Sequence, residues 1–259
     1  MTTIAAESGH WYDAKTAEPR YTVPNKSKPG EFRATTIRDA KANGYVPSVT
    51  TITRACLPAP GLEMWKMDQT IMSALTLPVI EGETLEDRKE RIKTDAKEQA
   101  TKAAEFGTNV HTAIERFMAG QTVEPEFEPF CIAALAELEK EIPGFTLEKC
   151  EAERSFVHSS LPYGGKVDLH SRDLNFVLDF KTKSFGPTDK VQPYDEQFIQ
   201  LAAYKEGLSM LLSARVLNVF ISTTTPGLVR IVEHDPAKHE KWWSAFKSMF
   251  ETWQILKWR

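Results

Sequence analysis

The stretch GGKVDLHSRDLNFVLDFKTK, residues 164–183, decides the fold expected for this chain. Apolar and polar side chains alternate with a period close to two over 164–171 and again over 176–181, which is typical of β-strands. The polar residues 171–175 between these runs favour a turn. A further β-rich run at 147–158 precedes them. We therefore expect a meander of three strands in the middle of the chain.

Helices are expected on both sides of this meander, because apolar or small residues recur there every three or four positions. The expected helices cover residues 62–77, 85–99, 94–118, 130–141, 195–213 and 236–256, and two further strands are expected at 215–222 and 228–234. From residue 94 onward the order is helix, helix, three strands, helix, two strands, helix. This order predicts an α/β fold in which helices flank a central β-sheet.

The N-terminal part of the chain has a different composition. Residues 1–43 are rich in Thr, Pro, Lys and Gly, which favours short strands and loops. At Tyr45–Thr53, a proline turn precedes a β-branched run whose hydroxyl groups are suited to cap a helix. No linker separates two domains. We expect an N-terminal arm and helical region over 1–93, packed on a core formed by 94–259.

Composition sets limits on location and partners. The 259 residues are 41% hydrophobic, enough for one large core, and no apolar run approaches the roughly 18 residues of a membrane span. Met1–Gly9 lacks the basic opening and apolar segment of a secretory signal, so we expect a cytoplasmic protein. The net charge of −4 argues against a nucleic-acid partner unless carboxylates hold cations that meet the phosphates.

Two acids and a lysine of the meander are the candidate catalytic group. Ten residues separate Asp168 from Asp179, a spacing that brings the two together on neighbouring strands, with Lys181 on the same face as Asp179. Adjacent carboxylates repel each other unless a cation lies between them, and Mg²⁺ or Mn²⁺ suits oxygen ligands. Lys181 would orient or deprotonate the attacking water and stabilise charge on a phosphate. A surface hairpin of salt-bridged acids and lysines remains an open alternative.

Two expected helices carry further candidates. His111 lies on the small-residue face of the helix before the meander, where a histidine serves as a metal ligand or, more commonly, as a core residue. Gln200 and Tyr204 are four residues apart, so their amide and phenol lie on one side of the helix after the meander. That side is suited to hydrogen-bond phosphates or base edges, although the spacing by itself is common.

Taken in order, these motifs resemble the RecB-like branch of the PD-(D/E)XK nuclease superfamily. The matching elements are His111, Gly165-Lys166-Val167-Asp168, Asp179-Phe180-Lys181-Thr182 and Gln200-Leu201-Ala202-Ala203-Tyr204. Upstream, Val46-Pro47-Ser48-Val49-Thr50-Thr51-Ile52 looks like a segment of phage exonucleases and of mitochondrial genome maintenance exonuclease. The Pro-Asp pair of the superfamily name is absent, but a Gly-x-x-Asp motif is usual in this branch.

The resemblance implies a restriction-endonuclease-like core with a mixed sheet, and it assigns roles to particular residues. His111, Asp168, Asp179 and the backbone carbonyl of Phe180 would bind Mg²⁺, or Mn²⁺ in its place, and Lys181 would serve catalysis. Glu153 is similar to an acid often found on the first strand of such a meander, although a solvated glutamate fits as well. Cys56, Cys131 and Cys150 are too few and too scattered for an iron–sulfur cluster or a disulfide framework.

The same resemblance implies contacts with DNA. Gln200 and Tyr204 would help to hold DNA near the site. Ser48, Thr50 and Thr51 have hydroxyl groups that suit either a DNA backbone or a helix cap. Lys183 would lie along the path of the DNA strand, or it is an ordinary solvated lysine.

The function expected from these features is a metal-dependent DNA exonuclease that leaves 5′-phosphates in recombination, repair or replication, of the kind that phages encode. It would act in the bacterial host cytoplasm on DNA with a free end, beside a recombinase or single-strand-binding protein. Two alternatives stay open. One is an endonuclease for flaps or branched DNA, and the other is an inactive DNA-binding protein, against which the intact Asp168, Asp179 and Lys181 argue.

Overall fold

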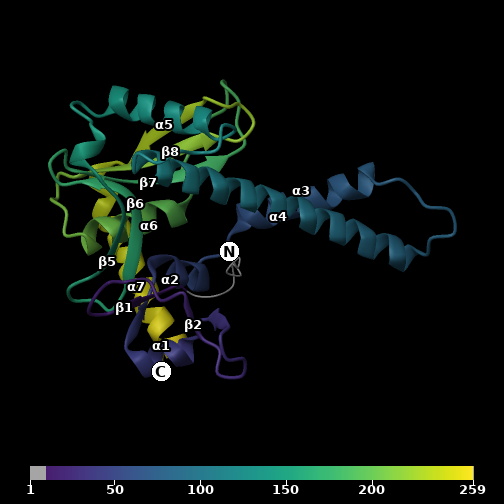
Figure 1. Ribbon diagram of the computed structural model, residues 1–259, viewed down its shortest axis with the longest axis horizontal. Coiled ribbons are helices and arrows are strands. Elements are labelled where there is room, and N and C mark those ends of the chain that lie inside the picture. Colours follow the sequence, from purple (N-terminus) through teal and green to yellow (C-terminus); the bar gives the residue numbers. More distant parts are fainter. Residues whose placement is uncertain (1–9, 259) are drawn as a thin grey trace.

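A five-stranded mixed sheet forms the centre of the protein (Figure 1). The computed structural model describes residues 10–258, so the expectations for Met1–Gly9 lie outside the described residues. The strands follow the chain in the order β5 (Glu151–Val157), β6 (Gly164–Ser171), β7 (Phe176–Lys183), β8 (Arg215–Ser222) and β9 (Val229–Glu233). Only the β7–β8 pair is parallel; the other pairs of this sheet are antiparallel. The expected α/β sheet flanked by helices is confirmed.

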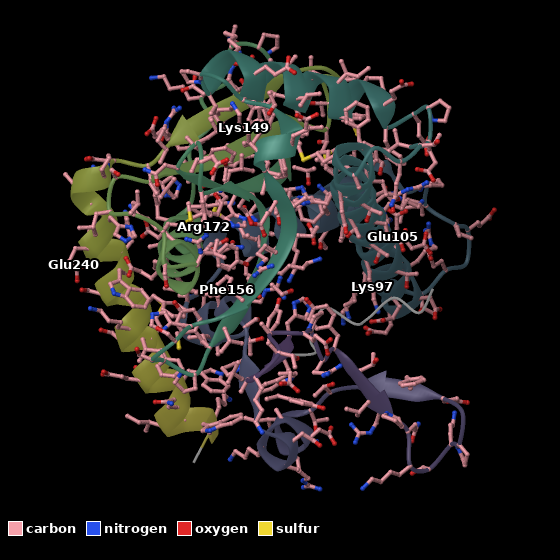
Figure 2. The ribbon with its side chains drawn as sticks, turned by 60° about the vertical axis from the view of Figure 1, so that its left-hand side comes forward. Lys97, Glu105, Lys149, Phe156, Arg172 and Glu240 are labelled. Atoms are coloured by element: carbon pink, nitrogen blue, oxygen red, sulfur yellow. The ribbon has the colours of Figure 1, made fainter. Side chains whose placement is uncertain are left out.

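Helices cover both faces of this sheet. One face carries α4 (Leu85–Met118) and α5 (Glu128–Glu141), and the other carries α2 (Val49–Cys56), α6 (Asp195–Gly207) and α7 (His239–Trp253). Figure 2 shows α7, marked by Glu240, and α4, marked by Lys97 and Glu105, on opposite sides of the molecule. The sheet therefore has a buried core on each face, and residues near the end of its central strands lie between two helical layers.

The N-terminal segment packs against the C-terminal helix. Its elements are β1 (Trp11–Asp13), β2 (Thr22–Pro24), β3 (Phe32–Ala34), α1 (Ile37–Asn43) and β4 (Tyr45–Pro47). β1 pairs with β4 and β2 with β3, both antiparallel. The Trp11 side chain is buried, and its ring centre lies 6.2 Å from that of Trp253. Its indole Nε1 donates a hydrogen bond to the Thr35 carbonyl. These contacts hold the N-terminal segment against α7.

The helices expected at 85–99 and 94–118 are one helix of 34 residues, α4. Thr84 caps it by accepting a hydrogen bond from the Asp87 amide, and no proline interrupts it. The expected domain boundary between residues 93 and 94 thus falls inside a helix. The first half of α4 pairs with α3 (Pro60–Thr76), and the two project from the body as an arm (Figure 1). Within 10–258, no helix is both long and apolar enough to cross a membrane.

Three elements are shorter than expected because local turns replace their ends. Residues 147–149 form a 3₁₀ turn, so the first meander strand begins at Glu151. The helix expected to reach 213 ends at Gly207, and the buried Lys205 amine binds the following loop through the carbonyls of Leu212 and Ala214. The last helix lies between a 3₁₀ turn at Pro236–Lys238 and a π turn at Gln254–Trp258.

Candidate active site

The strands β6 and β7 separate at the point where the two aspartates lie. They are paired only from Leu169–Ser171 to Phe176–Leu178, so β7 continues past Leu178 without a β6 partner. The Phe180 amide at this end donates to the Asp168 carboxylate, with 2.7 Å between N and Oδ2. The Asp168 carboxylate thus replaces the backbone acceptor that a paired β6 strand would supply. This hydrogen bond satisfies the Phe180 amide and holds the Asp168 side chain against β7.

The alternation of β6 breaks at Asp168. Val167 belongs to the core under α6 and α7, whereas Leu169 belongs to the core under α4 and α5, although regular alternation would place both on one face. On β5, Glu153 lies opposite Asp168 between two regular pairs and has a left-handed φ of 54°. This irregularity directs Asp168 toward the separated end of the strands instead of into either core.

Asp179 is held by three donors. Lys181 Nζ lies 2.5 Å from its Oδ2, Gln200 Nε2 donates to Oδ1 at 3.1 Å, and Asn218 Nδ2 donates to Oδ2 at 3.3 Å. The residue is 2% exposed. The lysine comes from the same strand two residues on, the glutamine from α6 and the asparagine from β8. A buried carboxylate with this set of partners has one fixed orientation.

A relay that sequence reasoning missed continues from Asn218 to His234. His234 Nε2 lies 2.8 Å from Asn218 Oδ1, and burial followed by the charge of His239 lowers the His234 pKa to about 4. His234 is therefore neutral, and its Nε2 donates to Asn218 because the amide of Asn218 is turned toward Asp179. The available signal was Asn218 itself, a lone amide in the apolar run Val216–Ile221.

His111 comes to the site from α4, as expected. Its Nδ1 lies 3.7 Å from Asp168 Oδ2, and burial followed by the charge of Lys181 lowers its pKa to about 4. The imidazole is thus neutral at ordinary pH, which is the form that binds metals. One turn earlier, Gly107 permits α4 to approach β7: a Cβ there would lie 2.8 Å from Thr182 Oγ1. Close packing of this helix on the strand places His111 beside Asp168.

Burial and neighbouring charges shift the pKa values of Asp168 and Lys181. Burial, and then the negative charge of Asp179, raises the Asp168 pKa to about 7. Burial by itself would lower the pKa of Lys181, but the carboxylates of Asp179 and Asp168 outweigh it and raise that pKa. Lys181 is therefore a cation that cannot accept a proton. Charge stabilisation fits a protonated lysine, and the expected role of Lys181 in orienting or deprotonating the attacking water stays a prediction.

The donors near Asp168 are chemically suited to a divalent cation. Carboxylate oxygen suits Mg²⁺ or Mn²⁺ and neutral imidazole nitrogen is a metal ligand, and a cation would offset the burial and the Asp179 charge that raise the Asp168 pKa. Across residues 10–258, however, no three His, Cys, Asp or Glu side chains form a ready cluster for an ion. A cation there would have to displace Lys181 from Asp179. The ligand role of the Phe180 carbonyl stays a prediction.

Glu153 lies beside Asp168 but pairs with another residue. Its carboxylate forms an ion pair with Lys166, which follows from their positions on the adjacent strands β5 and β6. Both side chains are partly buried. The structure thus brings Glu153 to the edge of the site with its charge already compensated.

Gln200 and Tyr204 lie on the side of α6 that faces Asp179. Gln200 Nε2 reaches the Tyr204 hydroxyl at 3.0 Å in addition to Asp179, and Tyr204 is buried. Gly165 makes room for this ring, because a Cβ there would lie 2.8 Å from both Tyr204 and Phe156. The pair positions Asp179, and the expected contact with DNA stays a prediction.

Ser48 is the N-cap of α2, and Thr50 and Thr51 lie in its first turn. Ser48 Oγ accepts a hydrogen bond from the Thr51 amide at 2.9 Å and lies 3.0 Å from Thr50 Oγ1. The capping alternative is confirmed for Ser48. A bridge between Ser48 and Gly164 places the cap next to the start of β6, and a contact of these hydroxyls with DNA stays a prediction.

A cleft of about 890 Å³ opens beside Lys181. Its walls come from the segment that joins α2 to α3, from α4, from the end of β7 and from the start of α6. Lys183 lies in this cleft with its Nζ 4.8 Å from the centre of the Tyr194 ring, which is the position expected for a cation stacked on an aromatic face. The cleft therefore connects the acid site to a partly aromatic surface.

Comparisons with known proteins do not assign a role to this site. No family model and no curated protein matches the chain. Among solved structures, the chain is similar to the one described as "Crystal structure of SSO0001", at 13% identity and a TM-score of 0.32, over 73% of this chain and 86% of that chain. This likeness is too slight to support a conclusion about fold or function.

Proposed function

We propose that this protein is a metal-dependent deoxyribonuclease that hydrolyses phosphodiester bonds and leaves 5′-phosphates. One observation carries the proposal: Asp168 and Asp179 meet at the separated end of β6 and β7, with the Lys181 cation 2.5 Å from Asp179 and the neutral His111 3.7 Å from Asp168. A purely structural ion pair would not need a second buried acid whose pKa is raised to about 7.

The residues divide the work of hydrolysis among them. Asp168, Asp179 and His111 would hold a divalent cation, which supplies polarisation of the phosphate and a water of lowered pKa. Lys181 stabilises negative charge on the phosphate, since its own pKa is raised and it stays protonated. Gln200 and Asn218 keep the Asp179 carboxylate in one orientation. The surrounding burial strengthens each of these interactions.

The test is a time course on end-labelled single- and double-stranded DNA with Mg²⁺, Mn²⁺, Ca²⁺ or EDTA. We expect cleavage with Mg²⁺ or Mn²⁺ and none in EDTA. Asp179→Asn and Lys181→Ala should abolish cleavage, and circular dichroism should confirm that each variant keeps its fold. Full activity of both variants would disprove the assignment.

Covalently closed circular single strands separate the two modes of attack. We propose an exonuclease, which needs an end and leaves such circles intact, with recombination, repair or replication of DNA as its setting. Linearisation of circles would instead establish the alternative, an endonuclease for flaps or branches with the same site. A protein that binds DNA without any metal-dependent cleavage would establish the third class, an inactive binding protein.

A further inference from the structure

The cleft beside Lys181 has the chemistry of a nucleobase site. Its floor is the end of β7, where Lys181, Thr182 and Lys183 follow one another, and one wall is the start of α3 with Trp65. Tyr194, at the start of α6, lines the cleft as well. The volume of about 890 Å³ lies within the range of roughly 300–1,000 Å³ typical of small-molecule sites. One or two nucleotides fit such a space, and a duplex does not.

Aromatic surface in this cleft is available to a ligand. Tyr194 is 49% exposed, although it touches Gly61 at the start of α3, where a Cβ would lie 3.4 Å from its ring. Trp65, on α3, is half-buried and lines the same cleft. Aromatic side chains stack on any base, because each base presents a flat π face. Apolar neighbours such as Leu57 and Leu62 shield that stack from water.

The charges in the cleft indicate on which side a sugar–phosphate backbone would run. Lys183 lies over the Tyr194 ring, so a base that takes this place on the ring would leave the ammonium group beside the adjoining phosphate. Lys181 joins the same floor and contacts Asp179, which links the cleft to the acid site. Asp195 and Glu196 line the α6 wall and would repel phosphates. The backbone is therefore expected along β7 and the base toward the aromatic walls.

We propose that this cleft binds an unpaired nucleobase of single-stranded DNA against Trp65 and Tyr194, with the adjoining phosphate at Lys183. The inference rests on the proposed function, since it treats the cleft as the approach of the strand to Asp168 and Asp179. It extends that function by naming the substrate class. The enzyme recognises an unpaired strand by stacking and without reading its sequence.

Binding is tested without cleavage by measuring fluorescence anisotropy of a labelled oligothymidylate in EDTA. The same strand in a blunt duplex serves as the competitor. Wild type should prefer the single strand, and Trp65→Ala should weaken binding about tenfold, the effect of one lost stacking contact. Tyr194→Phe, which keeps the ring, should bind like wild type, whereas Tyr194→Ala should not. Met64→Ala, one residue from Trp65 and outside the cleft, is the matched control.

An abasic scan makes the test specific to a position. Oligonucleotides that lack one base each should show one position at which wild type loses affinity and Trp65→Ala loses none. Equal affinity for the duplex, or no sensitivity to any abasic position, would disprove the base site. The proposed function fails separately, through loss of Mg²⁺-dependent cleavage: an active enzyme without abasic sensitivity disproves only the cleft proposal.

Discussion

Asn218 lies directly opposite Asp179 across the parallel β7–β8 pair, and its amide donates to the Asp179 carboxylate at 3.3 Å. Both residues are buried, and His234 in turn holds the other end of the Asn218 amide at 2.8 Å. A neutral donor chain thus reaches the same carboxylate oxygen, Oδ2, that Lys181 contacts. The orientation of Asp179 depends on a residue of the next strand as well as on its own.

Replacing Asn218 should impair the site more than it destabilises the fold. Asn218→Leu keeps the volume but removes the donor to Asp179 and leaves His234 without its acceptor. We expect an unfolding free energy lower by about 1–3 kcal/mol, from the buried groups left unpaired. Cleavage or Mg²⁺ affinity should fall by about 10- to 100-fold, as for other residues that orient metal ligands.

The control for this prediction is Leu138→Ala in α5. Leu138 is buried in the core on the opposite face, so its loss lowers stability through a cavity and leaves Asp179 untouched. Folded Leu138→Ala should cleave normally per molecule, measured at a temperature where both variants are native. Equal losses of activity in both variants would mean that Asn218 acts through stability alone.

Asp168 gives the metal-free protein a specific dependence on pH. Its pKa is raised from an ordinary 3.8 to about 7, so the folded state keeps a proton that the unfolded state has lost. Between these values, stability falls as pH rises. Denaturant titrations in EDTA at about pH 5 and pH 8 should show this loss in wild type, and it should be absent in Asp168→Asn.

The pH dependence of cleavage follows from the same group. Mg²⁺ binds the ionised carboxylate, so activity and Mg²⁺ affinity should rise with pH through about 7. His111 does not account for this rising limb of the pH–activity profile, because its pKa is lowered to about 4. Excess Mg²⁺ should move the limb to lower pH, since the ion competes with the proton. A limb that does not respond to Mg²⁺ would exclude Asp168 as the titrating ligand.

Much of the fold follows from local pattern. The strands at 164–171 and 215–222 match because alternating or continuous apolar runs end at clear turn residues. The position of Asp168 beside Asp179 also follows from the hairpin spacing. The sequence pattern predicts two helices where the structure has the single helix α4, because the first half is charged and the second half is more apolar, although no residue between them breaks a helix.

The partners of the acids were harder to foresee. Asn218 approaches Asp179 only because β8 runs parallel to β7, after a crossover through α6, and no local pattern encodes that register. The pairing of Glu153 with Lys166 depends on a left-handed residue that is not glycine. The helical spacing of Gln200 and Tyr204 predicts that they share one side of α6. Their contact with Asp179 depends on how closely α6 packs against the sheet, which local sequence does not encode.

Gly107 should be sensitive to one added methyl group. In Gly107→Ala the new Cβ would lie 2.8 Å from Thr182 Oγ1, so either the Thr182 side chain must rotate or α4 must move away from β7. We expect a loss of about 1–3 kcal/mol from overpacking, despite the better helix propensity of alanine. Because His111 lies one turn along α4, cleavage should fall as well.

A double-mutant cycle isolates this contact. Thr182→Ala removes Oγ1, and the Cβ of residue 182 would lie 3.9 Å from the new methyl group, an ordinary contact. Gly107→Ala with Thr182→Ala should therefore recover most of the lost stability, with a coupling energy of about 1 kcal/mol or more. Additive losses would show that the close approach of α4 to β7 at this point is not tight.

Glu153 offers the sharpest test of which acids bind metal. Its carboxylate is compensated by Lys166, so Glu153→Gln should retain Mg²⁺-dependent cleavage within about tenfold, whereas Asp168→Asn should abolish it. Glu153→Gly should be more stable than Glu153→Gln by about 1 kcal/mol, because glycine adopts the φ of 54° without strain. Loss of cleavage together with weaker Mg²⁺ binding in Glu153→Gln would instead make Glu153 a ligand, and its ion pair with Lys166 a feature of the metal-free protein.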